Sequence, residues 1–409
     1  MRILRKIRYI FKKQRRYILR AMDKFVQFIA DVLYDRKTTF AAKCIGIILL
    51  PFSFIFTLIV KLRIWFYGKH YLYSQPLGCH VIVVGNITMG GTGKTPVAEY
   101  LAKLLRAMGR RPAIISRGYK SKGEPPYRKF FRWLTHSPDK PPKVVSDGEN
   151  VLLDSELAGD EPYMLAKNLK GVPVVVDKDR VKAGRYAIRR LGADVLILDD
   201  GYQYLRLRSS LRLALIDKSN PFGNHYLLPR GILREPLAHL DRASCILLTK
   251  SDGREDRVLE EKIRRVNGGA QIVECCHKPC YFVVHSTGEV RPLEVLRRRK
   301  VAIFCAIASP EGFERFILSL GAHIIYKKRY IDHHRFTHSE LSRINERSQG
   351  ADFLVTTEKD AVRIVGDFQF SVPLFYMRVE VQFLRNGEWV QEILQRTLDS
   401  VKNHEKMRK

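Results

Sequence analysis

The stretch Val84-Gly85-Asn86-Ile87-Thr88-Met89-Gly90-Gly91-Thr92-Gly93-Lys94-Thr95-Pro96 decides the fold of this 409-residue chain. It follows an apolar strand predicted at His80–Val84 and leads into a predicted helix that ends at Gly109. That helix has one apolar face, formed by Val97, Leu101, Leu104, Leu105 and Met108. Glycines between a strand and a helix let consecutive backbone amides surround phosphate oxygens at the positive end of the helix. In such a loop Lys94 would reach the β- and γ-phosphates, and the Thr95 hydroxyl would hold Mg²⁺.

Eight residues form the predicted nucleotide-binding loop: Thr88, Met89, Gly90, Gly91, Thr92, Gly93, Lys94 and Thr95. The loop departs once from the pattern G-x-x-x-x-G-K-[ST], because Thr88 stands where the pattern has glycine. An ordinary glycine-rich turn is the alternative interpretation. We favour the nucleotide site because the strand, the glycines, the Lys-Thr pair and the helix all agree.

Positive charge is concentrated near the N-terminus. The net charge is +30, and residues 1–70 hold sixteen Lys and Arg against three Asp and Glu. Such a surface suits nucleic acid, anionic lipid or a phosphorylated substrate. We expect no nucleic-acid partner, because no zinc finger or aromatic RNA-binding strand is present. Seven scattered cysteines indicate a reducing compartment, and the run Cys275–Cys280 lacks a second ligand pair at zinc spacing.

An apolar run follows the basic segment. It extends from Cys44 to Val60, is interrupted by Pro51, and has cations and aromatic residues on both flanks. Its length is at the short end for a spanning helix, and cations at both ends disfavour a span. We therefore expect two helices, broken at Pro51, that lie in the membrane interface. A helix packed on the protein's own core is the alternative.

Residues 80–250 alternate between apolar strands and helices. Beyond the first strand, strands are predicted at Pro112–Ser116, Val172–Val176, Asp194–Leu198, Leu211–Ile216 and Cys245–Thr249, and helices include Glu161–Lys170 and Arg180–Leu191. Continuous apolar strands separated by helices predict a parallel sheet with helices on both faces. The proline-rich basic sequence at 121–150 predicts a loop or surface insertion.

A second alternating unit follows. Two linker strands are predicted at Gln271–Glu274 and Tyr281–Val284, with a turn at Gly288. Further strands are predicted at Val301–Ile307, His323–Tyr330, Phe353–Thr356 and Leu374–Val379, with helices at Pro310–Leu320 and Ser339–Ser348. We expect a smaller α/β domain joined through this β-strand linker, and a disordered charged tail beyond Asn403.

Two carboxylates, Asp199 and Asp200, end a buried strand. A strand-end aspartate is what a phosphate-loop enzyme uses to hold Mg²⁺, directly or through water. The alternative is a strand end that turns at Asp-Gly. Because a phosphate loop lies upstream, we predict a metal site formed by Thr95, Asp199 and Asp200.

A series of short motifs resembles the tetraacyldisaccharide 4'-kinase family, the inner-membrane kinases of lipid A synthesis. In chain order they are Gly85–Thr88 with Gly91–Pro96, Ser116–Tyr119, Gly159–Pro162, Asp199–Gln203, Phe222–Asn224, Leu228–Gly231, Leu233–Pro236, Asp332–His334 and Thr356–Asp360. They cover roughly residues 40 to 380. Thr88 fits the family's own loop. Tyr202 and Tyr204 stand where the family often has Phe and His, so this chain departs from the family pattern at both places.

The resemblance implies transfer of the ATP γ-phosphoryl group to the 4'-hydroxyl of a tetraacylated glucosamine disaccharide 1-phosphate, with Mg²⁺, at the cytoplasmic face of the inner membrane. It implies Asp160 as the catalytic base, with His333 beside Asp332 orienting it and Lys94 neutralising charge. Taken alone, Asp160 would be a helix cap and His333 a structural histidine in a polar loop. No obligate protein partner is inferred.

Seven residues in the motif loops are predicted to bind the substrate: Arg117, Glu161, Arg180, Gln203, Arg230, Arg234 and Glu235. The arginines offer forked donors that could grip phosphate. Glu161 and Glu235 could accept hydrogen bonds from sugar hydroxyls or amides. The alternative for each charged residue is a surface or structural ion pair.

The expected fold class is α/β, with a P-loop kinase-like parallel sheet, a smaller α/β domain and an N-terminal membrane-associated helix. The expected parts are a basic extension at 1–36, a membrane-associated helical segment at 37–73, a P-loop kinase domain at 74–270, a two-stranded linker at 271–295, a C-terminal α/β domain at 296–400 and a disordered tail at 401–409.

Three rival functions stay open. A regulatory GTPase would use Thr249-Lys250-Ser251-Asp252 in place of N-K-x-D to read guanine, although its first residue is Thr. A membrane-positioning ATPase would have a second lysine early in the loop, where this chain has Met89. A nucleic-acid-binding module rests on charge alone.

Overall fold

In the computed structural model of the chain, the described residues are 28–29, 31–35, 39–118, 140–307, 310–332, 334–364, 366 and 368–406. Most of the predicted basic extension at 1–36 and most of the predicted insertion at 121–150 lie outside them. The chain divides into two compact units. The smaller unit consists of Met1–Tyr71, Ile87–Gly90 and Asn220–His239, and the larger of Leu72–Asn86, Gly91–Ser219 and Leu240–Lys409.

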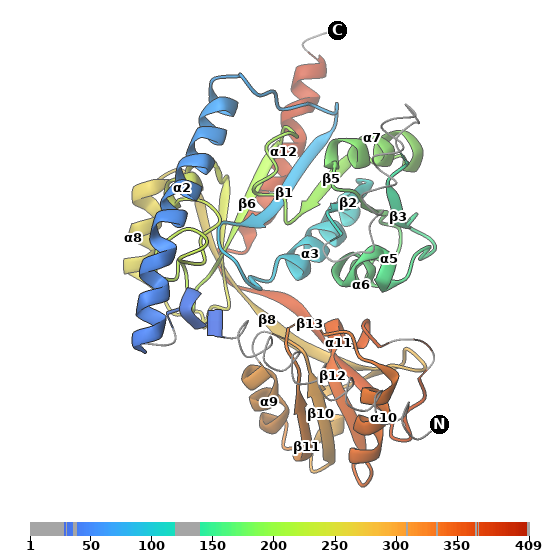
Figure 1. The fold of residues 1–409 in the computed structure, drawn as a ribbon. Coiled ribbons are helices and arrows are strands. Elements are labelled where there is room, and N and C mark those ends of the chain that lie inside the picture. The colour runs from blue at the N-terminus through green and yellow to red at the C-terminus, as the bar shows by residue number, and fades with distance from the viewer. Residues whose placement is uncertain are drawn as a thin grey trace, which may run out of the picture. The chain divides into compact units, whose positions relative to one another are not determined.

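The larger unit is built on one mixed sheet, which within the described residues has thirteen strands (Figure 1). The strands are β1 (His80–Asn86), β2 (Pro112–Ser116), β3 (Lys143–Ser146), β4 (Val174–Val176), β5 (Val195–Asp199), β6 (Leu211–Asp217), β7 (Cys245–Thr249), β8 (Gln271–Val284), β9 (Val290–Arg291), β10 (Lys300–Cys305), β11 (His323–Arg329), β12 (Phe353–Thr357) and β13 (Leu374–Arg385). Their order is β11-β10-β12-β13-β8-β7-β6-β1-β5-β2-β4-β3, and β9 pairs with β8.

Most neighbouring strands are parallel, as the apolar runs predict. The antiparallel pairs among the described strands are β13 with β8, β8 with β9 and β3 with β4. Between the strands along the chain lie the helices α3 (Lys94–Ala107), α5 (Ser155–Ala158), α6 (Asp160–Asn168), α7 (Arg180–Leu191), α8 (Arg257–Val266), α9 (Pro310–Ser319), α10 (His338–Arg347) and α11 (Glu358–Ala361), and α12 (Glu388–Lys406) follows the last strand. Short 3₁₀ helices cover Leu237–Arg242 and Leu293–Leu296.

Strand β1 shows why both faces of the sheet are covered. Its side chains alternate between the faces, so Ile82 and Val84 enter a core that α3, α6 and α12 complete, whereas Val81 and Val83 enter a core completed by α7. All seven residues of β1 are buried. The expected mixed α/β fold with a mainly parallel sheet is confirmed.

The two short linker strands predicted at Gln271–Glu274 and Tyr281–Val284 are wrong as separate strands. They belong to one strand, β8, whose partner β13 extends well past the predicted end at Val379. Pro279 lies opposite Val379, where the register shifts. An irregularity of this kind lets a β-ladder continue past a proline, which donates no backbone hydrogen bond.

Two further expectations need correction. The segment Lys143–Ser146, placed in a loop or insertion, forms the edge strand β3, because it pairs with β4 although it is only four residues long. Helix α12 continues to Lys406, into the tail predicted to be disordered. No Gly or Pro interrupts that sequence, so the helix can extend.

In the smaller unit, the expected break at Pro51 does not occur. Phe40–Gly68 forms one helix, α2, with Pro51 inside it. Proline removes one backbone hydrogen bond from a helix, and here the helix continues on both sides. Of the described residues, α2 alone is long and apolar enough, by length and composition, to cross a membrane.

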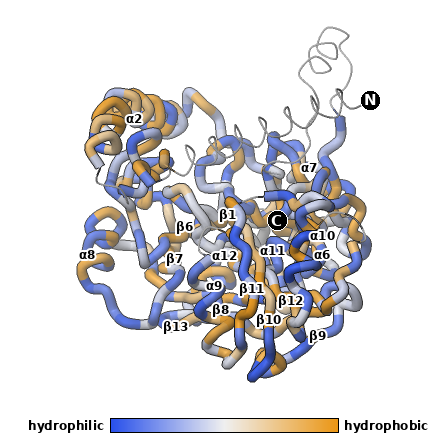
Figure 2. Tube along the Cα trace, turned by 60° about the horizontal axis from the view of Figure 1, so that its bottom comes forward, coloured by the Kyte–Doolittle hydropathy of each residue, from blue (hydrophilic) through white to orange (hydrophobic). Residues whose placement is uncertain are grey.

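One narrow face of α2 packs on the segment Asn220–His239. The buried helix residues are Ala42, Gly46 and Ser53. The Ser53 hydroxyl donates to the Leu227 carbonyl oxygen at 2.7 Å. A side chain at Gly46 would lie 3.2 Å from the Arg230 guanidinium. Much of the remaining helix surface is apolar and exposed, as the orange colour of α2 in Figure 2 illustrates.

Candidate active site

The phosphate loop follows β1 and leads into α3, as the sequence predicts. Gly93 is the N-cap of α3 and has φ 77°, a left-handed conformation that favours glycine. A Cβ atom at Gly93 would lie 2.0 Å from the ring of His277, which belongs to β8. Both the backbone and the neighbouring ring therefore require glycine at this position.

Lys94 connects the ends of two neighbouring strands. Its Nζ atom lies 3.3 Å from Asn86 Oδ1 at the end of β1 and 3.6 Å from Asp200 Oδ1, directly after β5. Strands β1 and β5 are parallel neighbours, so their carboxyl ends meet at one edge of the sheet. The predicted lysine and carboxylate therefore lie together.

The carboxylate of Asp199, one of the predicted metal ligands, is buried. Its Oδ1 atom has no hydrogen-bond partner among the described residues. Burial raises the pKa of Asp199 to about 7, and the negative charges of Glu161 and Asp200 add to this. A buried carboxylate oxygen that accepts no hydrogen bond and lies near other carboxylates is suited to bind a cation, because the cation would offset the negative charge.

The described part of the chain contains no group of three or more His, Cys, Asp and Glu side chains that could by itself hold a metal ion. Mg²⁺ commonly binds through one or two carboxylates and completes its shell with water and phosphate oxygens. The pair Asp199 and Asp200 meets that smaller requirement.

Asp160 and Glu161 lie in the first turn of α6. Basic side chains from distant parts of the sequence bind both carboxylates. Asp160 Oδ1 accepts from Arg335 Nη2 at 3.0 Å, and Asp160 Oδ2 accepts from Arg363 Nε at 2.8 Å. Lys359 Nζ donates to Glu161 Oε1 at 3.1 Å.

The predicted partner of Asp160, His333, lies outside the described residues. Its neighbour Asp332 places Oδ1 4.0 Å from Arg363 Nη2. Sequence reasoning missed Arg335, Lys359 and Arg363. Their signal was weak: Arg335 directly follows a quoted motif, Lys359 lies within another, and Arg363 follows that one by three residues.

Three predicted substrate residues of the larger unit have different surroundings. Arg180 is buried, donates from Nη2 to the Asp200 carbonyl oxygen at 3.2 Å and lies 4.7 Å above the Tyr204 ring. Burial lowers the pKa of Arg180. Gln203 Nε2 donates to the Asn86 carbonyl oxygen at 2.8 Å, so this side chain supports the start of the loop. Arg117 is exposed.

The predicted substrate residues Arg230, Arg234 and Glu235 belong to the smaller unit. There the start of the nucleotide loop pairs with the segment that carries the Leu-Arg-Glu-Pro motif: Thr88 forms a β-bridge with Leu233, and the Met89 amide donates to the Ile232 carbonyl oxygen at 2.7 Å. The Arg234 amide donates to the Ile87 carbonyl oxygen, also at 2.7 Å.

Arg230 and Glu235 both have local partners. Arg230 Nη1 lies 2.9 Å from Asp35 Oδ1, and its guanidinium covers the Tyr226 ring at 5.2 Å. Glu235 is buried, and its Oε2 lies 3.0 Å from His239 Nδ1. Both charged side chains thus have the structural ion-pair contacts that were the alternative to substrate binding.

In the segment Thr249–Asp252, the possible guanine-reading motif, the first two side chains contact the end of β6. The Thr249 hydroxyl donates to the Ile216 carbonyl oxygen at 3.3 Å, and Lys250 Nζ lies 2.5 Å from Asp217 Oδ2.

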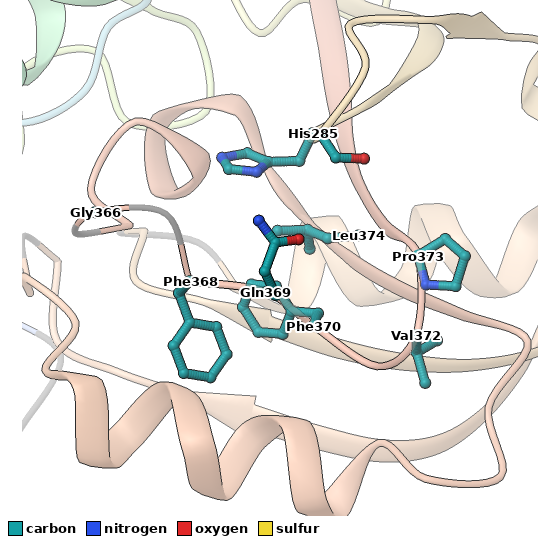
Figure 3. A pocket seen from close by; sticks show the side chains of 9 residues that line it. His285, Gly366, Phe368, Gln369, Phe370, Val372, Pro373 and Leu374 are labelled. Atoms are coloured by element: carbon teal, nitrogen blue, oxygen red, sulfur yellow. The ribbon is translucent and has the colours of Figure 1, made fainter.

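A cavity of about 230 Å³ lies in the loop before β13, where the His285 ring faces Gln369 (Figure 3). None of the predicted site residues lines it.

Comparison with known proteins identifies the family of the chain. The family model of tetraacyldisaccharide-1-P 4'-kinase matches residues 45–398. The tetraacyldisaccharide 4'-kinase of Syntrophus aciditrophicus is 36% identical over 349 residues, which cover 82% of this chain and 89% of that protein. The Geobacter sulfurreducens protein of the same name is 35% identical over 342 residues, covering 84% and 91%.

A solved structure is similar over most of the fold. LpxK from Aquifex aeolicus, in complex with ATP, has 30% sequence identity and a TM-score of 0.69. The match covers 86% of this chain and 99% of that one. The phosphate loop, the strand-end carboxylates and the matches in family model, sequence and fold lead to one conclusion: the chain belongs to the tetraacyldisaccharide 4'-kinase family.

Proposed function

We propose that the chain transfers the γ-phosphoryl group of ATP to the 4'-hydroxyl of a tetraacyldisaccharide 1-phosphate in lipid A biosynthesis. The observation that carries this proposal is the position of Lys94, 3.6 Å from the strand-end carboxylate Asp200, in a chain of this family. Phosphoryl transfer depends mainly on positioning and on neutralisation of charge, and these residues supply the second.

The nucleotide roles follow from the loop. The amides of residues 88–95 would bind the phosphates, and Lys94 would leave its resting contacts with Asn86 and Asp200 to reach the β- and γ-phosphates. Thr95, Asp199 and Asp200 would hold Mg²⁺, which neutralises the charge that develops on phosphate oxygens. The Asp199 Oδ1 atom, which has no hydrogen-bond partner within the described part of the chain, supports this assignment.

Asp160 is the proposed base for the proton of the acceptor hydroxyl. Each of its oxygens accepts one hydrogen bond from an arginine, and a carboxylate has about four acceptor positions. Acceptor capacity is therefore left for the hydroxyl. His333 would orient or tune this group, as the family resemblance implies.

The lipid headgroup would be bound by Arg117, Glu161, Arg180, Gln203, Arg230, Arg234 and Glu235. Arg117 has the clearest support, because its exposed guanidinium suits a phosphate. Gln203 and Arg180 would act largely as supports, because they already donate to the carbonyl oxygens of Asn86, just before the loop, and of Asp200.

The proposed location is the cytoplasmic face of the inner membrane, with helix α2 as the membrane-associated segment. The exposed apolar side chains of α2, among them Ile47, Phe54 and Ile59, support this placement. We retain the expected parts as a proposal: a basic extension at 1–36, a helical segment at 37–73, a kinase domain at 74–270, a linker at 271–295 and a C-terminal domain at 296–400.

A direct transfer assay tests the proposal. Purified protein would be incubated with Mg²⁺, [γ-³²P]ATP and tetraacyldisaccharide 1-phosphate, and the labelled lipid separated by thin-layer chromatography. We expect lipid labelling with ATP and far less with GTP. Lys94→Ala should lower kcat by about 10³-fold, because the lysine stabilises charge in the transition state.

Lys178→Ala is the matched control, since Lys178 is an exposed lysine of the same unit. It should label lipid at the wild-type rate. Absence of lipid labelling by the wild type would overturn the proposed function, and wild-type turnover by Lys94→Ala would overturn the assignment of the loop.

A further inference from the structure

The short helix α11 binds α6, the helix that begins with Asp160, through three polar pairs. Asn168 Nδ2 donates to Glu358 Oε1 at 2.7 Å. Lys359 Nζ donates to Glu161 Oε1 at 3.1 Å, and Arg363, just after α11, donates to Asp160 at 2.8 Å. Residues 358–363 thus contact both ends of α6.

Arg363 is the most constrained member of this set. Its side chain is fully buried. Nη1 donates to the Ala306 carbonyl oxygen and to Asp360 Oδ1, each at 3.0 Å. Burying a guanidinium is costly unless several acceptors compensate for lost water, so such a group is retained where its geometry matters.

Asp360 is itself fixed. It is buried, and its Oδ2 accepts from the Ala306 amide at 3.0 Å and from the Thr357 hydroxyl at 2.6 Å. The frame formed by Thr357, Asp360 and the Ala306 backbone therefore determines where the Nε atom of Arg363 points. That atom donates to Asp160 Oδ2.

We propose that Arg363 is a positioning residue for phosphoryl transfer, holding the Asp160 carboxylate in the orientation in which it accepts the proton of the acceptor hydroxyl. This inference rests on the proposed role of Asp160. Arg335 supports the other oxygen of Asp160, at 3.0 Å, and Arg363 Nη2 lies 4.0 Å from Asp332, the residue before His333. Arg363 thereby contacts the base and approaches the loop that carries its predicted partner.

A lysine could not replace this arginine. The planar fork sends Nε to Asp160 and Nη1 to Asp360 and Ala306 at once, whereas an ammonium group is a point charge on a flexible stem. Displacing a catalytic group by about 1 Å can cost about 10²-fold in rate. We therefore expect Arg363→Lys to lower kcat by about that factor.

The test is a double-mutant cycle between Arg363→Lys and Asp160→Asn, read as kcat and KM for ATP in the lipid-labelling assay. General-base catalysis contributes about 10²–10⁴-fold, so Asp160→Asn keeps a residual rate that radiolabel detects. We expect Arg363→Lys to lower kcat alone, with KM for ATP unchanged. In the Asp160→Asn background it should lower kcat by less than about twofold, because residues that act as a unit give non-additive losses.

Arg329→Lys is the matched control. Arg329 makes ion pairs with Glu311 and Glu314, both at 2.6 Å, and among the described residues it forms no ion pair or hydrogen bond with one proposed for the site. It should retain wild-type kcat. Asp360→Asn is a second variant for the case that Arg363→Lys does not fold, and it should lower kcat by about tenfold, because it loosens Arg363 without touching Asp160.

The outcomes separate the two proposals. Multiplicative losses in the cycle, or wild-type kcat in a folded Arg363→Lys or Asp360→Asn variant, would overturn the positioning role while leaving Asp160 as the base. Wild-type turnover by Asp160→Asn would instead remove Asp160 from the mechanism, and the role of Arg363 with it. Lipid labelling by the wild type, and hence the proposed reaction, would be unaffected by either result.

Discussion

Replacing Arg378 with leucine should destabilise the larger unit strongly. Arg378 belongs to β13 and is buried. Its Nη2 lies 2.7 Å from Glu99 Oε1 on α3, and its Nη1 lies 2.6 Å from Glu358 Oε2 on α11. One guanidinium therefore joins the helix of the phosphate loop to the helix that holds α6.

The expected magnitude follows from what the variant leaves behind. Glu99 and Glu358 would stay in place without their shared cation, with the amide of Asn168 donating to both and Lys103 beside Glu99. Removing one partner of a buried ion pair costs about 3–5 kcal/mol, because the remaining charge is buried without compensation. We expect a loss of free energy of unfolding in that range at pH 8.

The sign of the pH dependence distinguishes this explanation from a packing defect. Burial opposes ionisation of Glu99, but Arg378 and Lys103 outweigh it and hold the pKa of Glu99 below its ordinary value. Burial raises the pKa of Glu358 against the attraction of Arg378. In the wild type, Glu99 thus contributes stability above its unfolded pKa, and that stability is lost as the pH falls through its folded pKa.

Without Arg378, burial is the dominant influence on both carboxylates. Both folded pKa values should then lie above the unfolded values, so ionisation costs stability as the pH rises, and protonation relieves the cost as it falls. The stability deficit of Arg378→Leu should therefore be smaller at about pH 5 than at about pH 8.

Urea unfolding followed by far-ultraviolet circular dichroism at both pH values measures the deficit. Arg329→Leu is the control: Arg329 also pairs with two glutamates, but its side chain is 42% exposed, so we expect a much smaller loss than for Arg378→Leu. A deficit below about 1 kcal/mol for Arg378→Leu at pH 8, or equal deficits at both pH values, would refute the reasoning.

Three other predictions concern the site and the membrane. Asp160→Ala, His333→Ala and the double variant should lose kcat to a similar depth if the two residues act as a unit, whereas a double loss equal to the product of the single losses would show that they act independently. Gly93→Ala should raise KM for ATP by about tenfold or more, because the backbone at this residue has a positive φ and a methyl group there would lie 2.0 Å from the His277 ring. An unchanged KM would contradict this. Deleting residues 1–69 should release the protein from anionic vesicles in a flotation assay and leave ATP binding intact, since each lost cation near the surface is worth about 1 kcal/mol. Continued flotation of that variant would place the anchor elsewhere.

Local patterns were sufficient for the central elements. The strands Pro112–Ser116 and Cys245–Thr249 and the helix Arg180–Leu191 were predicted to the residue. Their apolar runs, their helical periodicity and the glycine after α7 are signals that lie within a dozen residues. The same holds for the Gly-Lys-Thr turn and for the carboxylates after β5, because strand-end positions can be read from the run before them.

Two longer elements, α2 and β8, were not predicted by these local patterns. Pro51 is a helix breaker by local preference, yet α2 continues through it and loses one hydrogen bond. Pro279 interrupts a strand pattern, yet β8 continues because its partner β13 shifts register opposite it. At Pro279 a neighbouring strand thus outweighs the local preference.

The sequence by itself determined the class of the fold, the family and the loop that would bind nucleotide, because each depends on residues adjacent in the chain. Only the tertiary structure decided which cations hold Asp160, since Arg335 and Arg363 are 175 and 203 residues away from it. It also decided that the His277 ring occupies the space beside Gly93. Ion pairs and steric contacts between distant segments follow no spacing rule, because the packing of helices on a parallel sheet, rather than the order of residues, brings those side chains together.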